Sequence, residues 1–189
     1  MLKKFAIVGL MLICTASIAS ASIIDANSRQ GGLDIGVGTG VIWSGANLQY
    51  GIADNLSIGA DYGTVDLTLA GGWIILIFDP KASMTGEYYD VHLNYQIVEG
   101  TDEQPVSVSL LGGIGGTVVK LNDVAQDNKT IAVGGICFSS PIFSDRFIGR
   151  LNLVVGPPLG TEFAWKITDN FEINAGLSLI SIIGLKISF

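Results

Sequence analysis

Hydrophobic and polar residues alternate along most of the chain after its first 21 residues, as they do in β-strands whose two faces meet different surroundings. The clearest stretch is YYDVHLNYQI (88–97), in which the odd-numbered positions are apolar and the even-numbered ones are mostly polar. Between residues 33 and 52 the apolar positions change from odd to even numbers. A two-residue hairpin at Ser44 and Gly45 would produce this change by pairing Trp43 with Ala46.

A turn followed by a strand occurs twice in closely similar form, as YGIADNLSIGA at 50–60 and WKITDNFEINA at 165–175. Asp and Asn suit tight turns because their side chains bond the nearby backbone and tolerate unusual dihedral angles. An even number of predicted strands separates the two turns, so we expect both on the same rim of one continuous meander. The repeat therefore indicates equivalent positions in a regular architecture.

The first 21 residues have the layout of a secretory signal peptide, with a basic start, an apolar run from Phe5 to Cys14 and the small residues ASA at 19–21. The apolar run is shorter than the roughly 20 residues that a spanning helix needs. We therefore expect a signal peptide over 1–21 and an exported mature chain, 22–189, that forms a single domain.

Removal of Lys3 and Lys4 with the signal peptide leaves eight basic and 17 acidic residues, a net charge of −9. This acidic balance argues against nucleic-acid partners, whose phosphates the chain would repel. Cys137 becomes the single cysteine, which excludes an internal disulfide, and we expect it to act as a small apolar residue on a strand.

The chain is unusually apolar for an exported protein, with 14% charged residues against about 25% in ordinary soluble domains, 49% hydrophobic residues and a mean hydropathy of +0.52. No apolar run beyond the signal reaches the length of a spanning helix. A closed β-barrel is the other structure that satisfies every backbone group inside a bilayer. The predicted fold is thus all-β, a closed antiparallel up-and-down transmembrane β-barrel of about ten strands, with eight as the alternative.

The ten predicted strands are separated by turn-forming residues, except near 180–182. The segment 171–189 alternates nearly to its end, but as one strand it would run about 60 Å, more than twice the ~25 Å apolar band of a membrane barrel. It is therefore divided into two. The expected strands are 33–43, 46–52, 56–66, 86–97, 105–114, 130–138, 147–155, 161–167, 171–179 and 183–189. Residues 64–85 resist assignment beyond the end of the third strand.

With its signal peptide, its repeated turn-plus-strand phrase and its ending GLKISF, the chain resembles a small Gram-negative outer-membrane β-barrel protein of the porin-like superfamily. In that family, a C-terminal aromatic residue preceded by alternating apolar residues is the signal read by the barrel-assembly machinery. The resemblance implies an outer-membrane location, lipid and the assembly machinery as partners, and an assembly signal at Ile183, Leu185, Ile187 and Phe189. Many relatives carry a further aromatic residue where this chain has Ile187.

The polar face of the predicted strands would then line the lumen, and its ionisable residues are few and mixed in sign. Unpaired charges in a narrow lumen are costly, so we expect cross-strand ion pairs. A barrel of this size lies nearer the filled eight-stranded barrels than the open porins, although a narrow passage with an acidic, cation-favouring lining is a second interpretation. The predicted lumen network is Asp34, Asp61, Asp90, His92, Arg150, Glu162, Lys166, Glu172 and Lys186.

Asp90 and His92 share one face of a strand, and ten-stranded outer-membrane proteases of the omptin type use an Asp-His pair to activate water. Such an enzyme needs a second acidic pair nearby, and nothing in the sequence marks one. A metal site is not predicted, because the chain has one His without a partner at ligand spacing. We expect no enzyme activity and no cofactor.

The predicted function is therefore that of an integral outer-membrane barrel, structural or a narrow passive pore for small solutes or ions. Two alternatives stay open. One is an omptin-like outer-membrane hydrolase that uses Asp90 and His92. The other is a soluble secreted barrel that binds an apolar ligand, because alternation alone does not say which face points inward.

Overall fold

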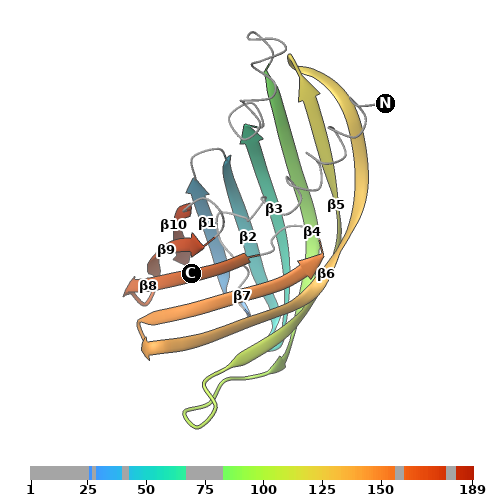
Figure 1. The fold of residues 1–189 in the computed structure, drawn as a ribbon. Coiled ribbons are helices and arrows are strands. Elements are labelled where there is room, and N and C mark those ends of the chain that lie inside the picture. Colours follow the sequence, from blue (N-terminus) through green and yellow to red (C-terminus); the bar gives the residue numbers. More distant parts are fainter. Residues whose placement is uncertain (1–25, 27–28, 40–42, 67–82, 156–159, 178–181) are drawn as a thin grey trace.

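The computed structural model describes residues 26, 29–39, 43–66, 83–155, 160–177 and 182–189. Ten β-strands make up nearly all of this part of the chain (Figure 1). Their bounds are β1 Leu33–Thr39, β2 Trp43–Ala53, β3 Leu56–Asp66, β4 Met84–Val98, β5 Ser107–Leu121, β6 Val124–Ser144, β7 Phe147–Val155, β8 Gly160–Thr168, β9 Phe171–Leu177 and β10 Ile182–Ser188. The signal peptide expected over 1–21 and most of the unassigned 64–85 lie outside the described residues.

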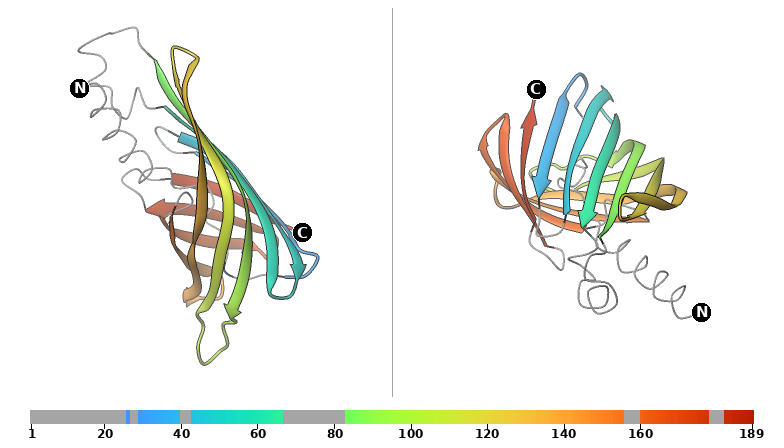
Figure 2. Two further views of the ribbon diagram at one scale, coloured as in Figure 1. Left: turned by 90° about the vertical axis from the view of Figure 1, so that its right-hand side faces the viewer. Right: turned by 90° about the horizontal axis from the view of Figure 1, so that it is seen from above.

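Each strand pairs antiparallel with its neighbours in sequence, and β1 pairs with β10 to close the sheet into a barrel. Figure 2 shows the strands surrounding a common interior. The predicted closed up-and-down barrel of ten strands is confirmed, and the eight-stranded alternative is wrong. Among the described residues, no helix is long and apolar enough to cross a membrane.

The predicted hairpin at Ser44 and Gly45 is wrong. These two residues lie inside β2 and pair with Thr39 and Gly38 of β1, so the connection falls at 40–42, outside the described residues. The change of parity is retained because Val37 pairs with Ala46, an odd residue with an even one. A turn placed a few residues earlier carries the same parity change, which is why alternation did not distinguish the two positions.

The fifth and sixth strands are longer than predicted. β5 and β6 continue to a two-residue turn at Asn122 and Asp123, whose φ angles of 50° and 64° suit the left-handed turns that match strand twist. β6 pairs with β7 only from Gly134 onward, so the tip of the β5–β6 hairpin projects beyond β7 (Figure 2, left), whereas β4 pairs with β5 as far as Met84 and Leu121. Residues 130–138, whose apolar positions do not keep to odd or even numbers, therefore form the middle of a long strand.

The barrel has an apolar outside and a polar inside. On β4, Val91 is 53% exposed, whereas the neighbouring Asp90 and His92 are 3% and 2% exposed. The same contrast recurs on the other strands, and it is the reverse of a soluble barrel, in which the apolar face fills the core. The resemblance to outer-membrane β-barrel proteins is thereby confirmed at the level of the fold.

One part of the interior is apolar. Leu111, Val133, Cys137 and Val154 project from β5, β6 and β7 and pack with Ala26, which precedes the first strand. Cys137 keeps its thiol and is fully buried in this cluster, as its predicted role as a small apolar residue requires. Ala26 thus places part of the chain before β1 inside the barrel.

The two Asp-Asn turns, at Asp54-Asn55 and Asp169-Asn170, lie on the same rim, as predicted. The turn between β6 and β7 at 145–146 and the 99–106 connection share this rim, which also holds the start of β1 and the end of β10. We call it the terminal rim. Leu33 and Phe189 exchange two backbone hydrogen bonds there, which continues the seam between the first and last strands.

Candidate functional site

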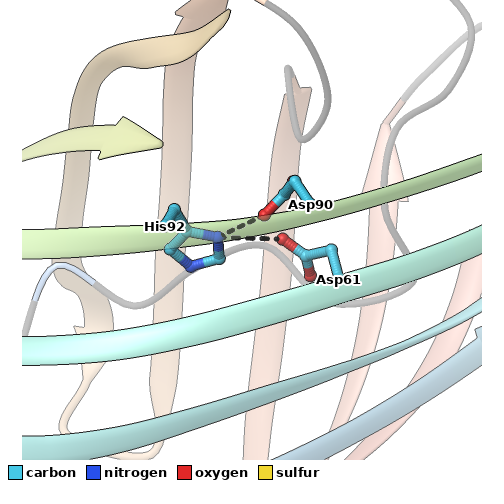
Figure 3. Close-up of side chains that lie close together, drawn as sticks. All are labelled: Asp61, Asp90 and His92. Carbon is cyan, nitrogen blue, oxygen red and sulfur yellow. Dashed lines mark hydrogen bonds and ion pairs between the residues drawn. The ribbon is translucent and has the colours of Figure 1, made fainter. Parts of the chain in front are cut away.

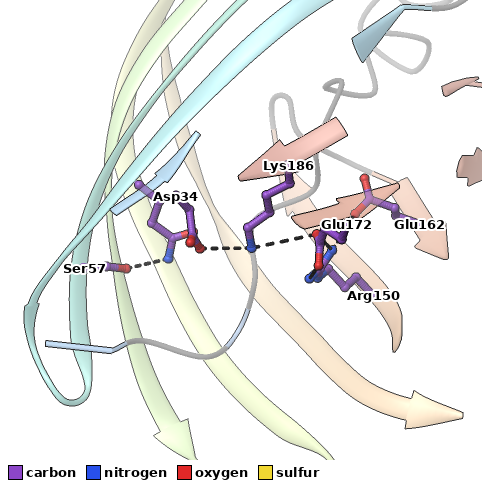
Figure 4. A network of polar contacts seen from close by, with 7 residues as sticks. Asp34, Ser57, Arg150, Glu162, Glu172 and Lys186 are labelled. Atoms are coloured by element: carbon purple, nitrogen blue, oxygen red, sulfur yellow. Dashed lines mark hydrogen bonds and ion pairs between the residues drawn. The ribbon is translucent and has the colours of Figure 1, made fainter. Parts of the chain in front are cut away.

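Five charged side chains form a connected ion-pair network inside the barrel near the terminal rim (Figure 4). Arg150 donates from Nη1 to Glu162 Oε1 at 2.8 Å. It also donates two hydrogen bonds to Glu172, from Nη1 to Oε1 at 2.7 Å and from Nη2 to Oε2 at 3.0 Å. Lys186 Nζ lies 3.0 Å from Asp34 Oδ2 and 4.0 Å from Glu172 Oε1. The network therefore runs from β7 across β8, β9 and β10 to β1.

Strand register explains why these residues meet. Arg150 and Glu162 are direct cross-strand partners, and so are Glu172 and Lys186. All four project inward and are almost fully buried. Buried charges are tolerated when opposite charges and hydrogen bonds compensate for the lost water, and the forked guanidinium of Arg150 supplies both. This cluster, which we call the rim network, fills this end of the lumen with paired opposite charges.

The chain before β1 folds back into the same end of the barrel. Gly31 donates a backbone hydrogen bond to Gly51, and Gly51 donates one to Gly32. A Cβ on Gly51 would lie 1.8 Å from the Arg29 carbonyl oxygen, so this close approach needs glycine. A cavity of about 170 Å³ remains here, with Arg29, Asp34 and Lys186 among its lining residues. The segment narrows the mouth of the barrel.

A second polar cluster, the acid–histidine cluster, consists of Asp61, Asp90 and His92 on the opposite wall (Figure 3). His92 Nδ1 lies 2.6 Å from Asp90 Oδ1 and 3.6 Å from Asp61 Oδ2. Asp61 and Asp90 are direct cross-strand partners of β3 and β4, and His92 follows on the same face of β4. All three side chains are buried.

More buried polar atoms lack a hydrogen-bond partner in the acid–histidine cluster than in the rim network. Both carboxylate oxygens of Asp61, Oδ2 of Asp90 and Nε2 of His92 are buried without a hydrogen-bond partner among the described residues. Buried polar atoms without partners are uncommon and need an explanation. One imidazole and two carboxylates can share a proton, orient a water molecule or ligate a metal ion.

The predicted lumen residues divide between these two clusters, with one exception. Asp34, Arg150, Glu162, Glu172 and Lys186 form the rim network, and Asp61, Asp90 and His92 form the acid–histidine cluster. Lys166 stays half-exposed at the terminal rim, where it lines the cavity. The residues of the expected assembly signal, Ile183, Leu185, Ile187 and Phe189, point outward from the last strand and its end.

Two features of the lumen were not predicted. Alternation placed Asp61 on the polar face but did not show that it faces Asp90, because the register of β3 against β4 is not contained in the pattern of either strand. The position of Ala26 in the lumen and of Arg29 at its mouth was also unforeseen, although the Gly31-Gly32 pair that precedes β1 is a sequence signal for a turn there.

No protein-family model matches the sequence, and no curated protein matches it. The solved chains to which the structure is similar include the following three. The N-terminal β-barrel domain of Pseudomonas aeruginosa OprF is 10% identical with a TM-score of 0.37, and the match covers 85% of this chain and 98% of that one. Neisserial surface protein A is 10% identical with a TM-score of 0.40 and coverages of 84% and 95%. Ail, the attachment invasion locus protein of Yersinia pestis, solved with the heparin analogue sucrose octasulfate, is 13% identical with a TM-score of 0.30 and coverages of 85% and 97%.

Proposed function

We propose that this chain is an integral outer-membrane β-barrel protein with a structural, non-enzymatic role, whose lumen passes at most ions and small solutes. The observation that carries the proposal is the inverted distribution of polarity. The side chains of Val91, Leu93 and Tyr95 are about half exposed on the outer surface, and Asp90, His92 and Asn94 between them are buried. A hydrocarbon environment stabilises such a surface, because in water the apolar side chains on every strand would be in unfavourable contact with solvent.

The contents of the lumen support a structural role over a wide channel. The rim network spans five strands, and the ring of Tyr88 is 1% exposed inside the barrel. Ala26 packs against the inner wall. Among the described residues, two cavities are found at the terminal rim, with volumes of about 170 Å³ and 350 Å³. A water molecule occupies about 30 Å³ in the liquid, so these spaces suit water molecules, ions or small solutes.

Lipid and the barrel-assembly machinery are the proposed partners. The outward-pointing apolar side chains supply the lipid contact, and the positions of Ile183, Leu185, Ile187 and Phe189 on the outer face of the closing strand leave them accessible during assembly. The backbone bonds between Phe189 and Leu33 support a role for the last residue in closing the barrel.

The omptin-like alternative finds support in one contact, the 2.6 Å separation of His92 Nδ1 and Asp90 Oδ1. However, His92 is 2% exposed in the middle of a strand, and a hydrolase must bring its water and the scissile bond of its substrate within hydrogen-bond reach of the base. The burial therefore favours the non-enzymatic proposal. Asp90→Asn distinguishes the two. Peptidase or lipase activity that is present in the wild-type chain and disappears with this change would establish the omptin-like enzyme.

The test of the main proposal is refolding of residues 22–189 into detergent. We expect β-rich circular dichroism and a gel mobility that changes on heating, as a closed barrel resists denaturation at room temperature. A mature chain that is monodisperse in buffer without any detergent would refute the membrane assignment. Planar-bilayer recordings distinguish a filled structural barrel from a narrow pore. A filled barrel passes no current, whereas a narrow pore gives small, cation-selective current steps.

A further inference from the structure

We propose that Asp61, Asp90 and His92 form a binding site for one divalent first-row transition-metal ion on the lumen wall. The proposal goes beyond the membrane role, because a barrel needs no metal to close. It rests on the geometry of the acid–histidine cluster and on the buried atoms in it that lack hydrogen-bond partners.

The backbone holds the three side chains together without help from loops. Asp61 and Asp90 face each other across β3 and β4, and His92 projects from the same face two residues further along β4. Gly59 is the cross-strand partner of His92, and a Cβ there would lie 2.3 Å from His92 Nε2. The missing side chain therefore makes room for the imidazole, and paired strands hold the three ligands in place.

The distances between the ligand atoms are close to those of a coordinated ion. One ligand atom from each residue can be chosen so that all lie within 4.8 Å of one another. Two ligands bound at about 2.1 Å to a tetrahedral ion are roughly 3.4 Å apart. The 3.6 Å from His92 Nδ1 to Asp61 Oδ2 already fits, whereas the 2.6 Å to Asp90 Oδ1 is a hydrogen bond that opens by under an ångström when an ion replaces the proton.

The charge of the cluster also calls for a cation. In the described part of the chain, the ion pairs of Asp61 and Asp90 are both with His92, so two acidic side chains share one imidazole as their basic partner. The rim network differs, since Arg150 and Lys186 there supply full positive charges to the buried carboxylates. A divalent ion held by these atoms would neutralise both aspartates and give Asp61 Oδ2, one of the unsatisfied carboxylate oxygens, a partner.

The donor set selects the class of ion. Imidazole nitrogen suits zinc, copper, iron and nickel, and carboxylate oxygen is compatible with each of them. Calcium and magnesium prefer six or more oxygen ligands, which the imidazole does not provide. Zn²⁺ is the appropriate probe because it accepts mixed nitrogen and oxygen ligands and has no redox chemistry. Binding releases the proton that His92 Nδ1 shares with Asp90.

The experiment uses the refolded mature chain without a histidine tag, treated with a chelator and titrated with Zn²⁺ by calorimetry. We expect one saturable site per chain. Loss of a partner that merely orients a metal ligand lowers affinity about 10–100-fold, so Asp61→Asn and His92→Gln, which remove ligands, should each weaken binding by about 100-fold or more. Asp34→Asn is the matched control, because it makes the same change in a lumen carboxylate that bonds Lys186.

Two results would overturn the proposal. One is a wild-type chain that shows no saturable Zn²⁺ binding. The other is an equal loss of affinity in Asp34→Asn. Heat-dependent gel mobility confirms that each variant has closed its barrel. If a variant does not fold, a measurement on the wild-type chain alone still tests the site. His92 is the single histidine of the chain, so bound Cu²⁺ should show magnetic coupling to one imidazole nitrogen, and its absence refutes the site.

Discussion

Replacement of Arg150 by methionine tests whether the rim network holds the barrel together. Methionine has a similar length and no charge, so the change leaves the carboxylates of Glu162 and Glu172 buried without the guanidinium that binds them. Arg150 makes three charge-assisted hydrogen bonds to these residues, at 2.8, 2.7 and 3.0 Å.

The expected loss of stability follows from these contacts. At about 1.5–3 kcal/mol for each charge-assisted hydrogen bond, the three bonds represent roughly 4.5–9 kcal/mol before compensation. Glu172 keeps Lys186 at 4.0 Å, which moderates the loss. Breaking a buried ion pair by removing one partner typically costs about 3–5 kcal/mol, and we expect a decrease in the free energy of unfolding within that range.

Urea titration of the chain refolded into lipid vesicles, followed by tryptophan fluorescence, measures this quantity. Lys166→Met is the control, because Lys166 is half-exposed at the same rim and its loss should change the free energy of unfolding by about 0.5 kcal/mol or less. The triple variant Arg150→Met, Glu162→Gln, Glu172→Gln should recover most of the stability, since it removes the uncompensated charges. An Arg150→Met variant no less stable than Lys166→Met would refute the reasoning.

Three further predictions address the membrane surface, the interior and the seam. Val91→Arg on the outer face should lower the free energy of unfolding in vesicles by about 2–4 kcal/mol. Val124→Arg at the tip of the β5–β6 hairpin should have little effect. Equal effects of the two changes would contradict a lipid-facing surface. Gly135→Ala should cost about 1–3 kcal/mol in urea titration, because its Cβ would lie 2.1 Å from a backbone oxygen, whereas Gly112→Ala meets nothing within 4 Å and should be neutral. Deletion of Phe189 removes a pair of backbone bonds at the seam, so cell fractionation should find less heat-modifiable barrel in the membrane, and undiminished assembly would argue against its role.

Much of the architecture could be read from alternation. A period of two is a local property, so each strand reveals its two faces without knowledge of its neighbours. The residues from Tyr88 to Ile97 placed β4, and the Asp-Asn pairs at 54–55 and 169–170 placed two turns on one rim. Length and composition then left a closed barrel as the way to satisfy the backbone, and the structure closes as expected.

The ends of strands were less predictable. The hairpin expected at Ser44-Gly45 lies earlier, and β5 and β6 extend to a turn at Asn122-Asp123 that was assigned to a connection. Parity is unchanged when a turn moves along a hairpin in step with both strands, so the pattern contains little information about where a turn lies. The pairing of hydrogen bonds across strands decides it.

The sequence by itself determined which residues face inward and that their opposite charges must pair in the lumen. The tertiary structure decided which charges meet. Asp61 lies beside Asp90, and Arg150 reaches Glu172 across an intervening strand, because register and closure bring together residues 29 and 22 positions apart. Register depends on hydrogen bonds between whole strands and on the joining of β1 to β10, and these are properties of the complete barrel that no single strand carries.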